Sequence, residues 1–94
     1  MERFDSVLGT VELTEEREQH ISQFHPEVKA LRTQFPDTLS QPDFMRRSRF
    51  DPKVFVLYQT LPHKKKYLAI AVETNQRNFI LIAYLTNKIQ HIPL

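Results

Sequence analysis

The first half of the chain has the hydrophobic spacing of helices, preceded by a short extended segment over residues 4–13. Thr14 suits the N-cap of a helix over residues 14–24, because its hydroxyl can accept a hydrogen bond from a free backbone N–H and two glutamates follow it. The His25-Pro26 pair interrupts this helix, because proline disfavours a helical conformation in the preceding residue. A second helix carries apolar residues at i, i+3 and i+7 from Val28, and either ends at the next proline or continues for one more turn.

In the second half, apolar and polar residues alternate with the period of two that is typical of β-strands. Four strands are predicted, over residues 44–50, 54–60, 67–73 and 78–86. The connections are short enough for hairpins, which favours an antiparallel meander. We therefore predict one α+β domain over residues 1–94, with N-terminal helices packed on a C-terminal antiparallel sheet of about four strands.

Glycine and cysteine usage excludes several classes of site. The chain contains one glycine, Gly9, and no cysteine. Rossmann fingerprints and Walker loops need two or three glycines, so that backbone N–H groups can approach phosphate. Without cysteine there are no disulfides, thiolate zinc sites or cysteine nucleophiles. If the protein binds phosphate, side chains are expected to bind it.

The charged N-terminus lacks the apolar core of a signal peptide, and no uninterrupted run of about 18 apolar residues occurs. We therefore expect a cytoplasmic protein with no membrane partner. Charge is divided unevenly: residues 1–43 hold four basic and nine acidic side chains, net −5, and residues 44–94 hold nine basic and two acidic, net +7. The basic half suggests a polyanionic partner, although solvated strand edges also use Lys and Arg.

The helix predicted over residues 14–24 places two polar residues on its apolar side. At about 100° per residue, Arg17 and His20 fall within the apolar arc that runs from Leu13 to Phe24. This face should turn toward the protein, so both side chains are candidates for a site. Each also has a structural explanation, since histidine can be satisfied within a core and arginine can lay its aliphatic stem on one.

Metal-free cleavage of RNA is the chemistry that these residue types fit. Attack of the 2′-OH on its own phosphate needs a general base, a general acid and groups that stabilise the phosphorane. Histidine can transfer protons near neutral pH, and Arg, Lys, Tyr and Thr can bind phosphate oxygens. The candidate catalytic residues are His20, His25, Tyr84 and Thr86, and the candidate phosphate- or RNA-binding residues are Arg17, Arg47, Lys65 and Lys88.

No metal or cofactor is expected, because only two of the three convergent ligands that zinc needs are at hand. A nucleophile elbow is also excluded, since it needs more than one glycine. Several candidates also have a structural explanation. Lys64, Lys65 and Lys66 have the composition of a solvated hairpin tip, and Tyr84 fits a half-buried strand position.

Three groups of residues together form a spaced motif. They are Thr14-x-x-Arg17-x-x-His20-Ile21-x-x-x-His25-Pro26-Glu27, then Pro42-Asp43, and finally Ile82-Ala83-Tyr84-Leu85-Thr86. The motif resembles that of the phage-associated nucleases of the barnase–EndoU–colicin–RelE superfold, over residues 11–90. The resemblance implies helices followed by an antiparallel sheet in an α+β domain. It also implies a metal-independent ribonuclease, often within toxin or phage systems.

Two hypotheses follow. The first is a metal-independent endoribonuclease that leaves a 2′,3′-cyclic phosphate; its partner is RNA and, for a toxin-like enzyme, also a cognate inhibitor or immunity protein. This hypothesis requires Arg17, His20, Tyr84 and Thr86 to line one cleft. The second is a non-catalytic RNA-binding or protein-interaction domain on the same fold, and it is favoured by Ile82, which stands where the resembled family usually has threonine.

Overall fold

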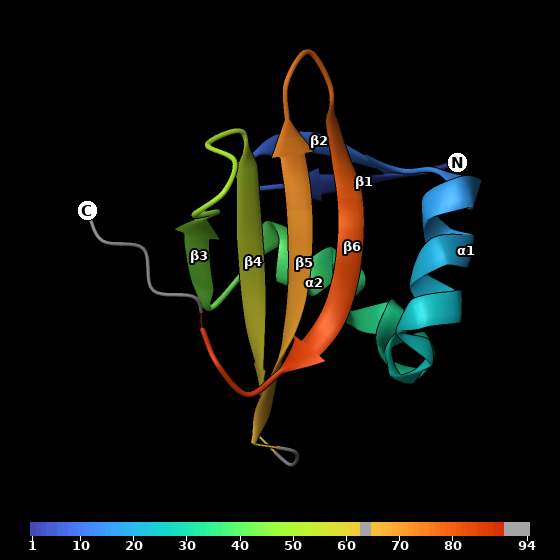
Figure 1. Cartoon of the computed structure of the whole chain (residues 1–94), viewed down its shortest axis with the longest axis vertical. Helices are drawn as coiled ribbons and strands as arrows, with labels where there is room; N and C mark the ends of the chain where they lie inside the picture. The colour runs from blue at the N-terminus through green and yellow to red at the C-terminus, as the bar shows by residue number, and fades with distance from the viewer. Residues whose placement is uncertain (63–64, 90–94) are drawn as a thin grey trace.

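The computed structural model describes residues 1–62 and 65–89 of the 94-residue chain. Lys64, predicted as part of a hairpin tip, lies outside the described residues. The elements follow the order β1 Glu2–Ser6, β2 Gly9–Leu13, α1 Glu15–Phe24, the 3-10 helix η1 Pro26–Gln34, α2 Phe35–Ser40, β3 Phe44–Arg47, β4 Val54–Leu61, β5 Lys66–Thr74 and β6 Asn78–Thr86. All six strands belong to one sheet, in the order β1-β2-β6-β5-β4-β3 (Figure 1).

The expected arrangement, helices followed by an antiparallel sheet of about four strands, is wrong. The domain is α+β, but its sheet has six strands and is mixed. β2 runs parallel to β6, with Val11 opposite Asn78 and Glu12 opposite Phe79, whereas the other neighbouring strands are antiparallel. The two additional strands precede the helices in the chain and extend the sheet beyond β6.

The β1–β2 hairpin occupies the residues expected to form one extended segment. Gly9 has φ +94°, in the region that favours glycine, and lets the chain reverse direction. The Ser6 hydroxyl donates to the Gly9 carbonyl at 2.7 Å and accepts from the Leu8 N–H at 2.9 Å. Asn78 Nδ2 donates to the Leu8 carbonyl at 2.7 Å, which ties the hairpin to the start of β6. No Asn-Gly pair signals this turn in the sequence.

The helix predicted over residues 14–24 is confirmed, with Thr14 as its N-cap and its hydroxyl accepting from the Arg17 N–H at 3.2 Å. Its predicted apolar arc is only partly correct, because Ile21 is buried but Phe24 is 59% exposed. The second helical segment is a 3-10 helix followed by a short α-helix. Within residues 1–62 and 65–89, no helix combines the length and the apolar character that crossing a membrane requires.

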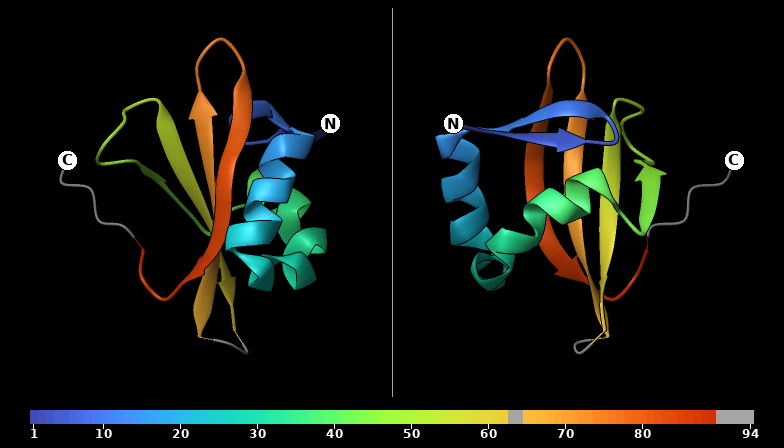
Figure 2. Two further views of the ribbon diagram at one scale, coloured as in Figure 1. Left: turned by 45° about the vertical axis from the view of Figure 1, so that its right-hand side comes forward. Right: turned by 180° about the vertical axis from the view of Figure 1, so that it is seen from behind.

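The helices and the β1–β2 hairpin cover one face of the sheet (Figure 2). The main core lies between them, and α1 contacts both η1 and β6. Its buried members come from both layers: Phe4, Val11, Leu13, Ile21, Val28, Leu31, Phe35, Leu39, Leu57, Leu61, Leu68, Ile70, Val72, Ile80 and Ala83. This packing fixes which face of the sheet is left for a site.

No helix of the described residues lies over the opposite face of the sheet (Figure 2). A second apolar cluster lies there, made of Val54, Val56, Tyr58, Ala69 and Ala71, with Tyr67, Leu81, Ile82, Tyr84 and Ile89 packed against it. Because alternate residues of a strand point to opposite faces, the apolar residues of β4, β5 and β6 supply both clusters.

Candidate functional site

The uncovered face of the sheet carries a groove of about 460 Å³. Its floor comes from β4, β5 and β6, its ends from the β3–β4 connection and from the segment that follows β6. The lining residues are Ser48, Phe50, Val54, Val56, Tyr58, Ala71, Ile82, Tyr84, Thr86 and Lys88. Tyr84, Thr86 and Lys88, three of the residues predicted from sequence, therefore share this groove.

Aromatic rings form a row across this face, from the edge strand β3 to the end of α1. The ring centroids of Phe44 and Tyr67 lie 6.1 Å apart and those of Tyr67 and Tyr58 lie 6.2 Å apart, both edge to face. Tyr58 and Tyr84 stand opposite the same alanine of β5, one from each side. The Tyr84 ring lies 6.0 Å from the ring of His25. The row thus ends at His25, directly after the last residue of α1.

Tyr84 is a hydrogen-bond donor at neutral pH. Burial raises the pKa of its hydroxyl above the usual value for tyrosine, and the charge of Tyr58 and a side-chain hydrogen bond with it raise the pKa further. The proton is therefore retained well above neutral pH. Because this hydrogen bond raises the pKa, the Tyr84 hydroxyl donates it to Tyr58, and a phosphate oxygen in the groove would take the place of Tyr58 as the acceptor.

His25 reaches Tyr84 around the edge of the sheet. It is the C-cap of α1, and its backbone N–H donates to the Ile21 carbonyl at 2.7 Å. Its Nδ1 lies 3.7 Å from Glu27 Oε2. The approach is open because β2 pairs only with Asn78 and Phe79 at the start of β6, which leaves the later part of β6 free for the end of α1.

Thr86 lies at the groove, but its hydroxyl is engaged. Its Oγ1 donates to the Lys88 carbonyl at 3.1 Å and accepts from the Lys88 N–H at 3.2 Å. These two bonds shape the turn after β6 and so set the position of Lys88. Thr86 is therefore a positioning residue in this geometry, and not a direct phosphate donor.

Arg17 and His20 do not line the groove. Arg17 lines a separate cleft of about 320 Å³ beside α1, together with Glu12 and Arg77. The His20 ring packs on the exposed Phe24 ring, with the centroids 4.6 Å apart. The four residues that the nuclease hypothesis requires in one cleft are thus divided between different surfaces, because only the C-terminal end of α1 approaches the groove.

The basic residues of β3 divide between the two faces of the sheet. Arg46 lies over the Phe44 ring at 5.8 Å, on the uncovered face, and pairs in register with Val56. Arg47 lies over the Phe55 ring at 5.3 Å, on the helix side. The sequence prediction selected Arg47 and missed Arg46, although the two-residue spacing from Phe44 was a signal. Lys65, in the β4–β5 connection, has φ +51°.

The described ranges hold no group of three or more His, Cys, Asp or Glu side chains arranged to bind a metal ion. No protein-family model matches the sequence, and comparison with curated proteins and with solved structures finds no match. The resemblance to the phage-associated nucleases therefore stays a prediction, and the groove must be interpreted from its own geometry.

Proposed function

We propose that the groove on the uncovered sheet face binds single-stranded RNA. The observation that carries this proposal is the row of aromatic rings along and beside the groove. Phe44, Tyr67, Tyr84 and His25 are at least partly exposed, and the buried ring of Tyr58 supports them from within. Every base has a π-face that can stack on such rings, and only unpaired bases are free to do so. The proposal includes a cytoplasmic location, where RNA is available.

Cationic side chains support the same partner. Arg46 stands beside Phe44 on the uncovered face, and Lys88 lines the groove beyond β6. Neither forms an ion pair with a carboxylate in the described part of the chain, so both charges are available to phosphates. Rings for the bases and cations for the backbone are the two components of a site for single strands.

A second candidate function is metal-independent cleavage of the bound RNA, favoured by the proximity of His25 to both Glu27 and Tyr84. His25 would accept the 2′-OH proton as the 2′-oxygen bonds to phosphorus, the bond from phosphorus to the 5′-oxygen would break, and the 5′-oxygen would take a proton from water. Tyr84 would donate a hydrogen bond to the phosphate. Lys88 would contribute charge. A toxin-like enzyme of this kind would also have a cognate inhibitor. Arg17 and His20 have no part in this smaller site.

Fluorescence anisotropy with a labelled single-stranded RNA, in EDTA, tests the binding proposal. Tyr67→Leu should weaken binding about fivefold or more, because stacking on an aromatic ring contributes about 1–3 kcal/mol per base. Phe24→Leu is the matched control, since Phe24 is an exposed ring outside the groove, and it should leave affinity unchanged. Tighter binding of duplex RNA, or equal losses in both variants, would contradict the proposal.

A further inference from the structure

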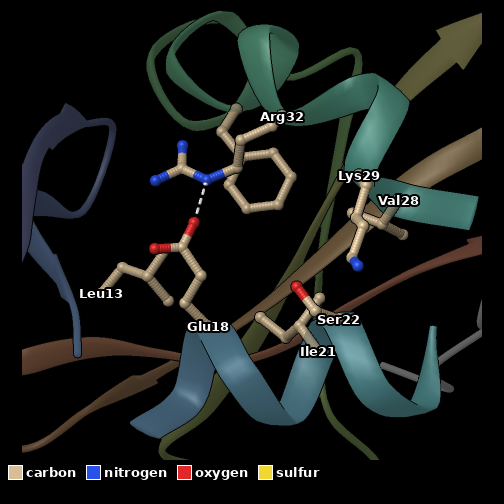
Figure 3. A pocket seen from close by; sticks show the side chains of 8 residues that line it. Leu13, Glu18, Ile21, Ser22, Val28, Lys29 and Arg32 are labelled. Carbon is tan, nitrogen blue, oxygen red and sulfur yellow. Dashed lines mark hydrogen bonds and ion pairs between the residues drawn. The ribbon is translucent and has the colours of Figure 1, made fainter. Parts of the chain in front are cut away.

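A separate cavity of about 210 Å³ lies between α1 and η1, on the helix side of the sheet (Figure 3). It shares no lining residue with the groove. Its inner wall consists of Leu13, Ile21, Val28 and Phe35, none of them more than 5% exposed. The apolar floor of this cavity therefore belongs to the main core.

An ion pair holds the two helical segments at one end of this cavity. Arg32 Nε donates to Glu18 Oε2 at 2.7 Å, and the Arg32 guanidinium also pairs with Glu2 of β1. The same guanidinium lies over the rings of Phe4 and Phe35, at 5.2 and 4.9 Å. Burial disfavours the charged guanidinium and by itself would lower the pKa of Arg32. The carboxylates of Glu18 and Glu2 outweigh this effect, and the pKa is raised. This wall is therefore fixed before any ligand arrives.

The side chains of Lys29 and Ser22 line the mouth of the cavity, and neither has a hydrogen-bond or ion-pair partner among the described residues. Figure 3 shows the Lys29 ammonium directed toward the Ser22 hydroxyl, away from the Glu18–Arg32 pair. Arg32 is occupied by two carboxylates, which leaves Lys29 as the cation of the lining that can bind an incoming group. Its charge selects an anionic end, and the serine hydroxyl can donate to the same oxygen atoms.

The volume limits what can enter. A cavity of about 150 Å³ lined by aliphatic side chains accepts benzene, so 210 Å³ accommodates one aromatic ring with a short substituent. We propose that this cavity binds a one-ring aromatic monocarboxylate, with its ring among Leu13, Ile21 and Val28 and its carboxylate on Lys29 and Ser22. This site is independent of the RNA-binding groove, and neither proposal depends on the other.

Methyl NMR titrations of the full chain test the site, with benzoate, benzyl alcohol and benzylamine as probes. Benzoate should shift the methyl signals of Ile21 and Val28 saturably at millimolar concentration, on the order of −4 kcal/mol. Benzyl alcohol should bind about threefold to tenfold more weakly, and benzylamine more weakly still. Equal affinity for the three probes, or no saturable shift at these methyls, would overturn the proposal.

Two variants separate the charge from the cavity. Lys29→Gln should reduce benzoate affinity to that of benzyl alcohol, whereas Lys66→Gln, at an exposed lysine of β5, should leave it unchanged. Ser22→Leu should fill the mouth and abolish binding of all three probes, with folding checked by circular dichroism. Undiminished benzoate binding in Lys29→Gln would overturn the charge assignment even if Ser22→Leu does not fold.

Discussion

The ring of His25 lies 6.0 Å from the ring of Tyr84, although one caps a helix and the other belongs to the last strand. Glu27 Oε2 lies 3.7 Å from Nδ1 of the same imidazole. The contact exists because β2 pairs only with the start of β6, which leaves the outer edge of the later part of β6 without a strand, so that the end of α1 can lie beside it. Through this contact, the C-terminal end of α1 meets the groove that Tyr84 lines.

If the domain cleaves RNA, His25 and not His20 should carry the reaction. In EDTA, His25→Ala should reduce the cleavage rate by about 100-fold or more, because a general base contributes about 10²–10⁴-fold. His20→Ala is the matched control on α1 and should retain the wild-type rate. The measurement is the formation of 2′,3′-cyclic phosphate ends on a single-stranded RNA. A loss in His20→Ala alone would move the active site to the outer face of α1.

The two adjacent arginines of β3 provide a paired test of the binding face. Arg46→Gln should weaken RNA binding and lower the slope of log affinity against log salt by about one, since one phosphate contact is removed. Arg47→Gln should change neither value, because Arg47 lies over Phe55 on the helix side. Anisotropy titrations at several salt concentrations measure both. Equal effects would show that RNA does not distinguish the two faces.

Alkaline pH should destabilise the domain partly through Tyr84. The pKa of its hydroxyl is raised by folding above the usual tyrosine value of about 10, so the folded state holds the proton where the unfolded state has lost it. The contribution of Tyr84 to stability is therefore fully present below pH 10 and is lost as pH rises through the folded pKa. Urea unfolding between pH 8 and about pH 11.5 should show a smaller decline in Tyr84→Phe than in the wild type. Parallel declines would contradict the raised pKa.

The hairpin that extends the sheet should depend on Gly9 and Asn78. Gly9→Ala should cost about 1 kcal/mol, because φ +94° strains a side chain although a Cβ there would meet Asn78 Nδ2 only at an ordinary contact distance of 3.5 Å. Asn78→Ala should cost about 1 kcal/mol by removing the donor to the Leu8 carbonyl. Each should lower the melting temperature by about 4–8 °C in thermal unfolding. Gln76→Ala, in the exposed β5–β6 turn, is the control and should have little effect.

The local pattern predicted much of the fold. Helix α1 and its Thr14 cap follow from capping chemistry and a period of 3.6, and β4, β5 and β6 follow from a period of two. The hairpin of residues 2–13 was missed, because its turn has no strong local signal and its stabilising partner is the distant Asn78. A parallel pair between the two ends of the chain has no signature in local spacing.

The candidate site was likewise predicted only in part, because local patterns determine some of its features and long-range contacts determine the others. Strand alternation alone places Tyr84 and Thr86 on one face, and the residue types alone favour phosphate chemistry without glycine or cysteine. Only packing decides that α1 presents its C-terminal end to that face, which brings His25 to Tyr84 and leaves Arg17 and His20 elsewhere. Periodicity determines which residues share a face, whereas the position of one face relative to another depends on contacts between residues far apart in the chain.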